Sequence, residues 1–137
     1  MERYYAIAKC LDIWMNLREK NHSINDYFKV RNIRKVGIYG YGILGKHLFW
    51  ELEQSDDAIC VSWILDQRAE RIMNLNCQVL QPEMIEKIEE PDLIVVSAIN
   101  DFEEIEMFIS EKTRVSVLSL ESIIIECNME LQMEHTV

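Results

Sequence analysis

The spacing of apolar residues divides the chain into a helical first segment and an alternating remainder. In the first segment apolar side chains recur every three or four residues, which predicts an amphipathic helix. The positions on this repeat are Tyr4, Ile7, Ala8, Leu11, Trp14, Met15 and Arg18. Ser23 is a suitable N-cap, with Asp26 three residues later, and predicts a second helix to about Val30. Residues 1–34 are therefore expected to form a helical hairpin whose aromatic side chains need a partner surface.

From Lys35 onward, short apolar runs alternate with amphipathic stretches. The predicted strands cover residues 36–39, 58–65, 77–80, 93–97 and 115–118. The predicted helices cover residues 46–53, a stretch that begins at Pro82, residues 102–111 and a short turn that ends at Ile125. Asn100 or Asp101 is expected to cap the third of these helices. Residues 126–137 show no clear period and are expected to be a C-terminal tail.

Strands that are apolar on both sides imply a parallel sheet covered by helices on both faces. Right-handed crossovers make 3-2-1-4-5 the simplest strand order. We therefore predict an α/β fold in which residues 35–125 form a doubly wound, five-stranded parallel sheet preceded by the N-terminal hairpin. In the first crossover helix, Leu48, Phe49 and Leu52 are expected to face inward.

A glycine-rich turn joins the first predicted strand to the helix that follows it. The turn reads Gly40-Tyr41-Gly42-Ile43-Leu44-Gly45, and Asp66 ends the second strand. This Gly-x-Gly-x-x-Gly pattern, followed by an acid about twenty residues later, is typical of Rossmann-like dinucleotide-binding domains. Gly40 allows a tight exit from the strand, Gly42 leaves room for a phosphate, and Gly45 lets the helix pack against the sheet. The turn is therefore predicted to hold a phosphate at a helix N-terminus.

The ends of the second and fourth strands supply the remaining candidate site residues. Asp66 is expected to accept hydrogen bonds from ribose hydroxyls, with Gln67 and Arg68 beside the same end of the ligand. A carboxylate here repels a 2′-phosphate and so favours NAD over NADP, although Arg68 weakens that preference. Ser97 and Asn100 end the fourth strand, beside the switch point where ligands bind, and are expected to line the pocket.

Two other nucleotide sites use similar residues. Gly40 to Lys46 also fits the phosphate-binding loop of nucleoside triphosphatases, but His47 stands where that loop needs Ser or Thr. A methyl-donor site would use a similar turn and strand-end acid, and it stays open as an alternative. No residue after the fourth strand is an evident proton donor, so the sequence identifies no catalytic residue.

Composition and charge narrow the choice of partners. The 137 residues carry a formal net charge of −10, which argues against a nucleic-acid ligand. Residues 1–46 contain nine Lys or Arg against four Asp or Glu, whereas the rest contains five against twenty. This asymmetry favours self-association, and we expect a homodimer formed through the N-terminal hairpin.

The length of the apolar runs and the spacing of the cysteines bear on the cellular compartment of the protein and on the state of its thiols. No apolar run is long enough to span a membrane and none resembles a signal sequence, so a cytoplasmic protein is expected. The cysteines are scattered, without metal-ligand spacing, and are expected to be reduced, packed thiols and not zinc ligands. They are Cys10, Cys60, Cys77 and Cys127.

Three segments carry a resemblance to a known group of domains. They read Val-Gly-Ile-Tyr-Gly-Tyr-Gly at 36–42, Ile-Leu-Asp at 64–66 and Pro-Asp-Leu-Ile-Val-Val-Ser at 91–97. Residues 35–124 thereby resemble nucleotide-binding Rossmann domains of bacterial cell-surface sugar metabolism. These include the N-terminal domains of nucleotide-sugar acetyltransferases and the cofactor-like domain of membrane nucleotide-sugar dehydratases.

In those proteins the domain binds NAD or a nucleotide sugar, while a further domain often performs the chemistry. The resemblance therefore implies a nucleotide-binding module for NAD(H) or a nucleotide sugar, linked to polysaccharide or nucleotide-sugar metabolism. NADP is a less favoured ligand. A small oligomeric NAD-dependent oxidoreductase and a degenerate Rossmann interaction domain are the alternatives.

Overall fold

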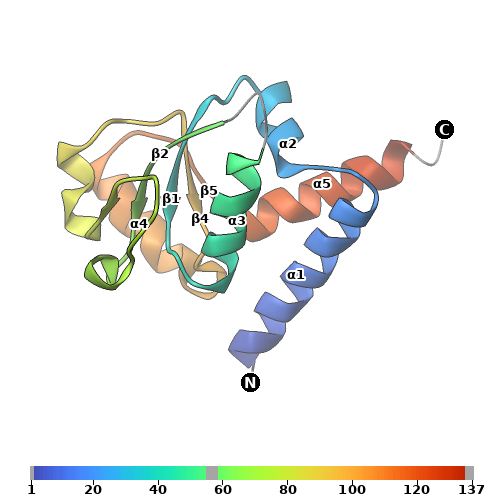
Figure 1. The fold of residues 1–137 in the computed structure, drawn as a ribbon, viewed down its shortest axis with the longest axis horizontal. Helices are drawn as coiled ribbons and strands as arrows, with labels where there is room; N and C mark the ends of the chain where they lie inside the picture. The colour runs from blue at the N-terminus through green and yellow to red at the C-terminus, as the bar shows by residue number, and fades with distance from the viewer. Residues whose placement is uncertain (1, 55–58, 135–137) are drawn as a thin grey trace.

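The computed structural model describes residues 2–54 and 59–134, where helices alternate with strands (Figure 1). The α-helices are α1 (Glu2–Glu19), α2 (Ile24–Val30), α3 (Ile43–Glu53), α4 (Phe102–Lys112) and α5 (Leu120–Glu134). The strands are β1 (Lys35–Tyr39), β2 (Cys60–Leu65), β3 (Val79–Leu80), β4 (Leu93–Val96) and β5 (Val117–Ser119). Short 3₁₀ helices connect them at η1 (Ala69–Arg71), η2 (Pro82–Lys87) and η3 (Ile99–Asp101).

The strands form one parallel sheet in the order β3-β2-β1-β4-β5, which confirms the predicted fold and strand order. β1 lies in the centre, paired with β2 on one side and β4 on the other. The carboxyl ends of these three strands therefore meet at one edge of the sheet. Ligands bind at this switch point in doubly wound folds.

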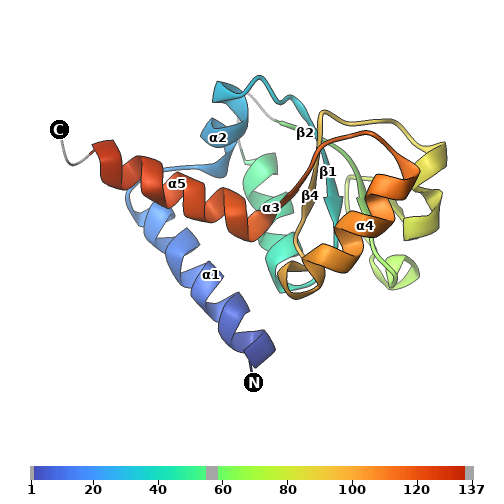
Figure 2. The ribbon, with the colours of Figure 1, turned by 180° about the vertical axis from the view of Figure 1, so that it is seen from behind.

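Helices cover both faces of the sheet (Figures 1 and 2). Val36 and Ile38 of β1 belong to the core shared with α1, α2, α3 and α5. On the opposite face, Trp63 of β2 and Ile109 of α4 are buried in a second core. A Cβ added at Gly37 would come within 2.5 Å of the Trp63 ring, so the glycine makes room for the indole.

The N-terminal hairpin packs on its own chain. α1 buries Cys10, Trp14 and Leu17 in the core that also contains residues of the sheet, α3 and α5. The predicted apolar stripe is wrong in part, because Tyr4 and Met15 are 69% and 62% exposed. Contacts with α3 and α5 select the neighbouring helix face instead. The partner surface that the hairpin needs is therefore supplied within the molecule for most of its apolar side chains.

A buried carboxylate fixes the hairpin to α3. Glu51 is 3% exposed, and its oxygens accept hydrogen bonds from Trp14 Nε1 at 3.0 Å and from the Ile24 backbone N–H at 2.6 Å. Ser23 Oγ donates a third hydrogen bond at 3.2 Å, and Arg18 Nε lies 3.5 Å away. Ser23 also caps α2, as predicted. Because a buried charge is tolerated only when it is paired, these contacts bind α1 and α2 to α3 as one unit.

Residues 126–134 of the predicted C-terminal tail are helical, contrary to prediction. α5 continues past Ile125 to Glu134, with Ile124 and Leu131 buried seven residues apart on the face that meets α1 and α2. Tyr27 Oη donates to Glu126 Oε2 at 2.9 Å, and Arg31 pairs with Glu130 at 2.8 Å. The acidic residues that obscured the helical period in the sequence therefore bind α2.

Several element boundaries also differ from prediction. β3 is shorter than the predicted strand at residues 77–80. β5 starts two residues later than predicted. The helix predicted to begin at Pro82 is a 3₁₀ helix. The predicted start of the second strand at residue 58 lies outside the described residues. Within the described part of the chain, every helix is too short or too polar to cross a membrane.

The cysteines are free, but they are not all packed. Cys10 is buried, and burial raises the pKa of its thiol to about 12. Burial likewise raises the pKa of Cys127 to about 12 and that of Cys77 to about 11. Cys60 is exposed, so the prediction of a packed thiol is wrong at this position. It begins β2, at the end of the sheet away from the glycine turn.

Candidate nucleotide site

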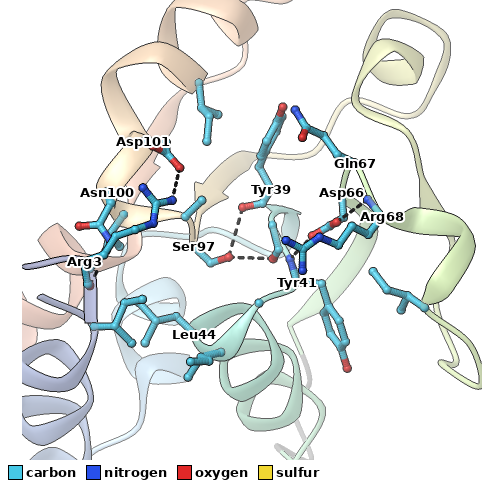
Figure 3. A pocket seen from close by; sticks show the side chains of 18 of the residues that line it. Arg3, Tyr39, Tyr41, Leu44, Asp66, Gln67, Arg68, Ser97, Asn100 and Asp101 are labelled. Carbon is cyan, nitrogen blue, oxygen red and sulfur yellow. Dashed lines mark hydrogen bonds and ion pairs between the residues drawn. The ribbon is translucent and has the colours of Figure 1, made fainter. Parts of the chain in front are cut away.

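A cleft of about 620 Å³ opens at the carboxyl ends of β1, β2 and β4 (Figure 3). Its volume lies within the range of small-molecule sites. Every predicted site residue except Gly45 lines it. These residues are Gly40, Tyr41, Gly42, Ile43, Leu44, Asp66, Gln67, Arg68, Ser97 and Asn100. The sequence therefore located the cleft, although the contacts of several residues differ from those predicted.

The three glycines of the turn have different surroundings. Gly40 has φ +104°, and a Cβ there would approach Ser97 Oγ to 2.8 Å. A Cβ on Gly45 would collide with the Gly40 carbonyl oxygen, so this pair allows α3 to lie against β1. A Cβ on Gly42 would meet nothing within 4 Å. Gly40 and Gly45 are therefore needed by the fold, whereas the fold leaves the space beside Gly42 open.

The first turn of α3 begins beside that open space. Gly42 is the N-cap residue and supplies no side-chain hydrogen bond to the helix. The helix starts at Ile43, three residues earlier than predicted. Backbone N–H groups in a first helical turn lack partners inside the helix, and the helix dipole adds partial positive charge there. A phosphate group is the ligand that such an arrangement suits best.

Asp66 holds the turn in place. Its Oδ2 accepts a hydrogen bond from the Tyr41 backbone N–H at 2.7 Å, and its Oδ1 accepts one from the Arg68 backbone N–H at 2.7 Å. The predicted ribose contact thus has a competitor that the sequence did not reveal. A carboxylate offers about four acceptor positions, so both oxygens keep acceptor capacity toward the cleft. Asp66 can bind a ribose hydroxyl while it supports the loop.

Arginines lie beside Asp66. Arg68 and Arg71 both line the cleft, and among the described residues neither side chain has an ion-pair partner. Figure 3 shows the Arg68 side chain extending toward the glycine turn. Two further lining residues were not predicted from the sequence: Arg71, which ends η1, and Ile72, which follows it. Their proximity depends on the tight fold of η1 after β2, which no periodic pattern indicates.

Ser97 and Asn100 line the cleft but are engaged in contacts with the protein. Ser97 is buried, and its Oγ donates to the Gly40 carbonyl oxygen at 2.7 Å, tying β4 to the turn. Asn100 Nδ2 donates to the Arg3 carbonyl oxygen at 3.2 Å. Asp101 is the N-cap residue of α4, as predicted, but its side chain makes no capping hydrogen bond and pairs instead with Arg3 at 2.8 Å.

Tyr39, at the end of β1, and Tyr41, in the glycine turn, both line the cleft. Burial raises the pKa of Tyr39, with further contributions from Asp66 and Glu83, and burial also raises the pKa of Tyr41. A phenol with a raised pKa stays protonated at neutral pH and can donate a hydrogen bond. It is not an activated proton acceptor.

The sequence matches no protein-family model and no curated protein. Among the described residues no cluster of three or more potential metal ligands occurs.

Proposed function

We propose that the chain is a nucleotide-binding module that holds NAD(H) or a nucleotide sugar at the Gly40–Gly45 turn. The observation that carries the proposal is the open space beside Gly42. The fold requires glycine at Gly40 and Gly45 on steric grounds, but no protein atom requires it at Gly42. A diphosphate that approaches the backbone at the N-terminus of α3 would require it.

The groups around Asp66 support a ribose at the β2 side of the cleft. Asp66 keeps acceptor capacity for hydroxyls, while Arg68 and Arg71 add positive charge beside it. These arginines favour an anionic ligand and reduce the penalty that Asp66 imposes on a 2′-phosphate. NAD is the favoured dinucleotide, and NADP is expected to bind more weakly. When bound, NAD(H) would supply hydride-transfer chemistry, and this chain would bind and orient it.

The resemblance of residues 35–124 to domains of nucleotide-sugar metabolism supports a uridine-type nucleotide sugar as the other ligand. It also supports a role in polysaccharide or nucleotide-sugar metabolism. We further propose a homodimer formed through the exposed face of α1, where Tyr4, Tyr5 and Met15 are each more than half exposed.

A thermal-shift panel tests the ligand. NAD, NADP, UDP-glucose, coenzyme A and S-adenosylmethionine would be compared, because a ligand that binds the native state raises its stability by about 2.7 kcal/mol at a hundredfold excess over Kd. We expect a shift with NAD or UDP-glucose. A shift with S-adenosylmethionine alone would identify a methyl-donor site. No shift with any of the five, together with no binding by calorimetry, would refute the proposal.

Substitution of Gly42 tests the position of the phosphate. Gly42→Val is expected to abolish binding of the ligand found in the panel while the thermal midpoint of the free protein changes little, because its side chain enters space that only ligand would occupy. Gly45→Ala is the matched control, since its methyl group would collide with the Gly40 backbone and lower stability instead. Unchanged affinity in Gly42→Val would place the ligand elsewhere.

A further inference from the structure

The cleft has a wall that is not part of the glycine-turn motif. Arg3 and Ile7 of α1 line it, and Figure 3 shows Arg3 on the side opposite Asp66 and Arg68. The glycine turn lies between these two sides. A ligand whose phosphate sits beside Gly42 therefore has room to extend in two directions, one toward Asp66 and the other toward α1.

The first turn of α1 is held against η3, which follows β4, by contacts of both the backbone and the side chain of Arg3. Asn100 Nδ2 donates to the Arg3 carbonyl oxygen at 3.2 Å, and Arg3 Nη2 lies 2.8 Å from Asp101 Oδ2. Further along the helix, Trp14 is buried and bonded to Glu51. The helix is therefore fixed along its length, and Arg3 has a defined place at the rim of the cleft.

Arg3 keeps hydrogen-bonding capacity that the protein does not use. A guanidinium group has five N–H donors, and the recorded side-chain contact of Arg3 is the one to Asp101. The Arg3 side chain is 62% exposed. Asn100, Asp101 and Glu104 also line the cleft, and Asn100 and Asp101 both contact Arg3, so donors and carboxylate acceptors stand together there.

This mixture suits a particular chemical group. A hydroxyl both donates and accepts, so neighbouring hydroxyls on a sugar ring can donate to the carboxylates while accepting from the guanidinium and the amide. A bare terminal phosphate would meet Asp101 and Glu104 as like charges. The polar side of the cleft therefore matches a sugar ring placed after the diphosphate.

We infer that the first turn of α1 is a binding wall for the second sugar ring of the ligand, and that Arg3 contacts the hydroxyls of that ring. The inference rests on the proposed function. Both ligand classes have such a ring after the diphosphate: the second ribose of a dinucleotide and the hexose of a nucleotide sugar. ADP and UDP lack it.

Calorimetric titration of Arg3→Gln with matched ligand pairs tests the inference. One pair is NAD and ADP, and the other is UDP-glucose and UDP. Loss of a hydrogen bond from a charged donor is expected to weaken NAD or UDP-glucose about tenfold or more and to leave the diphosphate of that pair nearly unchanged. The pair that shows the difference identifies the ring. Lys9→Gln, an exposed cation on α1 outside the cleft, is the control and is expected to change neither.

The outcomes separate this inference from the proposed function. If the unsubstituted protein binds none of these ligands, the proposed function fails and the inference fails with it. If it binds NAD or UDP-glucose and Arg3→Gln binds them equally well, the α1 wall is refuted while the nucleotide site stands. An equal loss for the diphosphate would show that Arg3 acts through the fold, which also overturns the inference.

Discussion

Asp66 bonds to two backbone N–H groups from different parts of the loop system, Tyr41 in the glycine turn and Arg68 after β2. These contacts stabilise the fold, and the proposed function adds a ribose contact at the same carboxylate. The two roles can be measured separately, because the proposed ribose contact needs ligand whereas the loop contacts do not.

Replacement of Asp66 by Ala is expected to lower the free energy of unfolding by about 1–3 kcal/mol, since two N–H groups lose their acceptor. Nucleotide affinity should fall as well, because the turn loses its support, and NADP should lose less than NAD. Urea unfolding and calorimetry measure the two effects. Glu70→Ala, an exposed acid in η1, is the control. Unchanged stability with selective loss of NAD would mean that Asp66 acts through the ribose alone.

The sequence predicted these residues better than it predicted their contacts. Gly40, Gly42 and Asp66 are recognisable because the motif fixes their types and spacing. The motif also predicted room beside Gly42 and close packing at Gly45, and both agree with the structure, but it could not show that Asp66 holds the turn through the N–H groups of Tyr41 and Arg68. Nor could it show that Ser97 and Asn100 bond to carbonyl oxygens of Gly40 and Arg3.

At the scale of single elements, α3 combines a predicted apolar face with a buried acid. Leu48, Phe49 and Leu52 are buried, as their helical spacing predicted. Glu51 lies on the same buried surface, where it meets α1 and α2. A charged residue in an amphipathic helix normally indicates the exposed face. Its pairing with the hairpin is therefore invisible without the tertiary structure.

Removal of the Glu51 carboxylate is expected to destabilise the protein strongly. Glu51→Ala leaves Trp14 Nε1 and the Ile24 N–H without their acceptor in a buried site and should cost about 3–5 kcal/mol of unfolding free energy. The exposed neighbour Glu53→Ala should change it by less than about 0.5 kcal/mol. Chemical denaturation followed by tryptophan fluorescence measures both. A small effect for Glu51→Ala would show that water replaces the carboxylate.

The helical elements at the two ends of the chain were the hardest to predict. In α1 the period was correct and the predicted face was partly correct: Trp14 is buried as predicted, whereas Met15 is exposed and Leu17 is buried in its place, because α3 and α5 contact a slightly different face. In α5 the buried positions are interrupted by acids that pair with Tyr27 and Arg31. Both cases depend on contacts between segments about a hundred residues apart.

For the whole molecule, the remaining apolar surface of α1 is the basis for the proposed self-association. Tyr4 and Met15 are eleven residues apart, about three helical turns, and share an exposed face. Light scattering at micromolar concentration is expected to give a dimer mass for the unsubstituted protein and a monomer mass for Met15→Glu. Met107→Glu, at an exposed position on α4, should leave the dimer intact. A monomer mass for the unsubstituted protein would exclude the dimer.

The proposed dimer is tested by point substitutions, because deletion of the N-terminal hairpin would expose the hydrophobic core to solvent. Trp14, Tyr27 and Phe28 all belong to the cluster that includes sheet residues.

The overall strand order could be predicted because parallel crossovers allow few topologies. The hairpin's position could not, since it depends on one acid and on shape complementarity.

The position of Arg3 has a practical consequence for handling the protein. The first turn of α1 stands at the rim of the cleft, whereas Figures 1 and 2 show the last turn of α5 well away from the N-terminal end of α1. An affinity tag fused ahead of residue 2 would emerge next to the cleft and could obstruct ligand entry or mimic occupancy through its own histidines. A tag fused after residue 134 avoids that interference. Ligand screens should therefore use carboxyl-terminal fusions, with amino-terminal ones as a steric probe of the same opening.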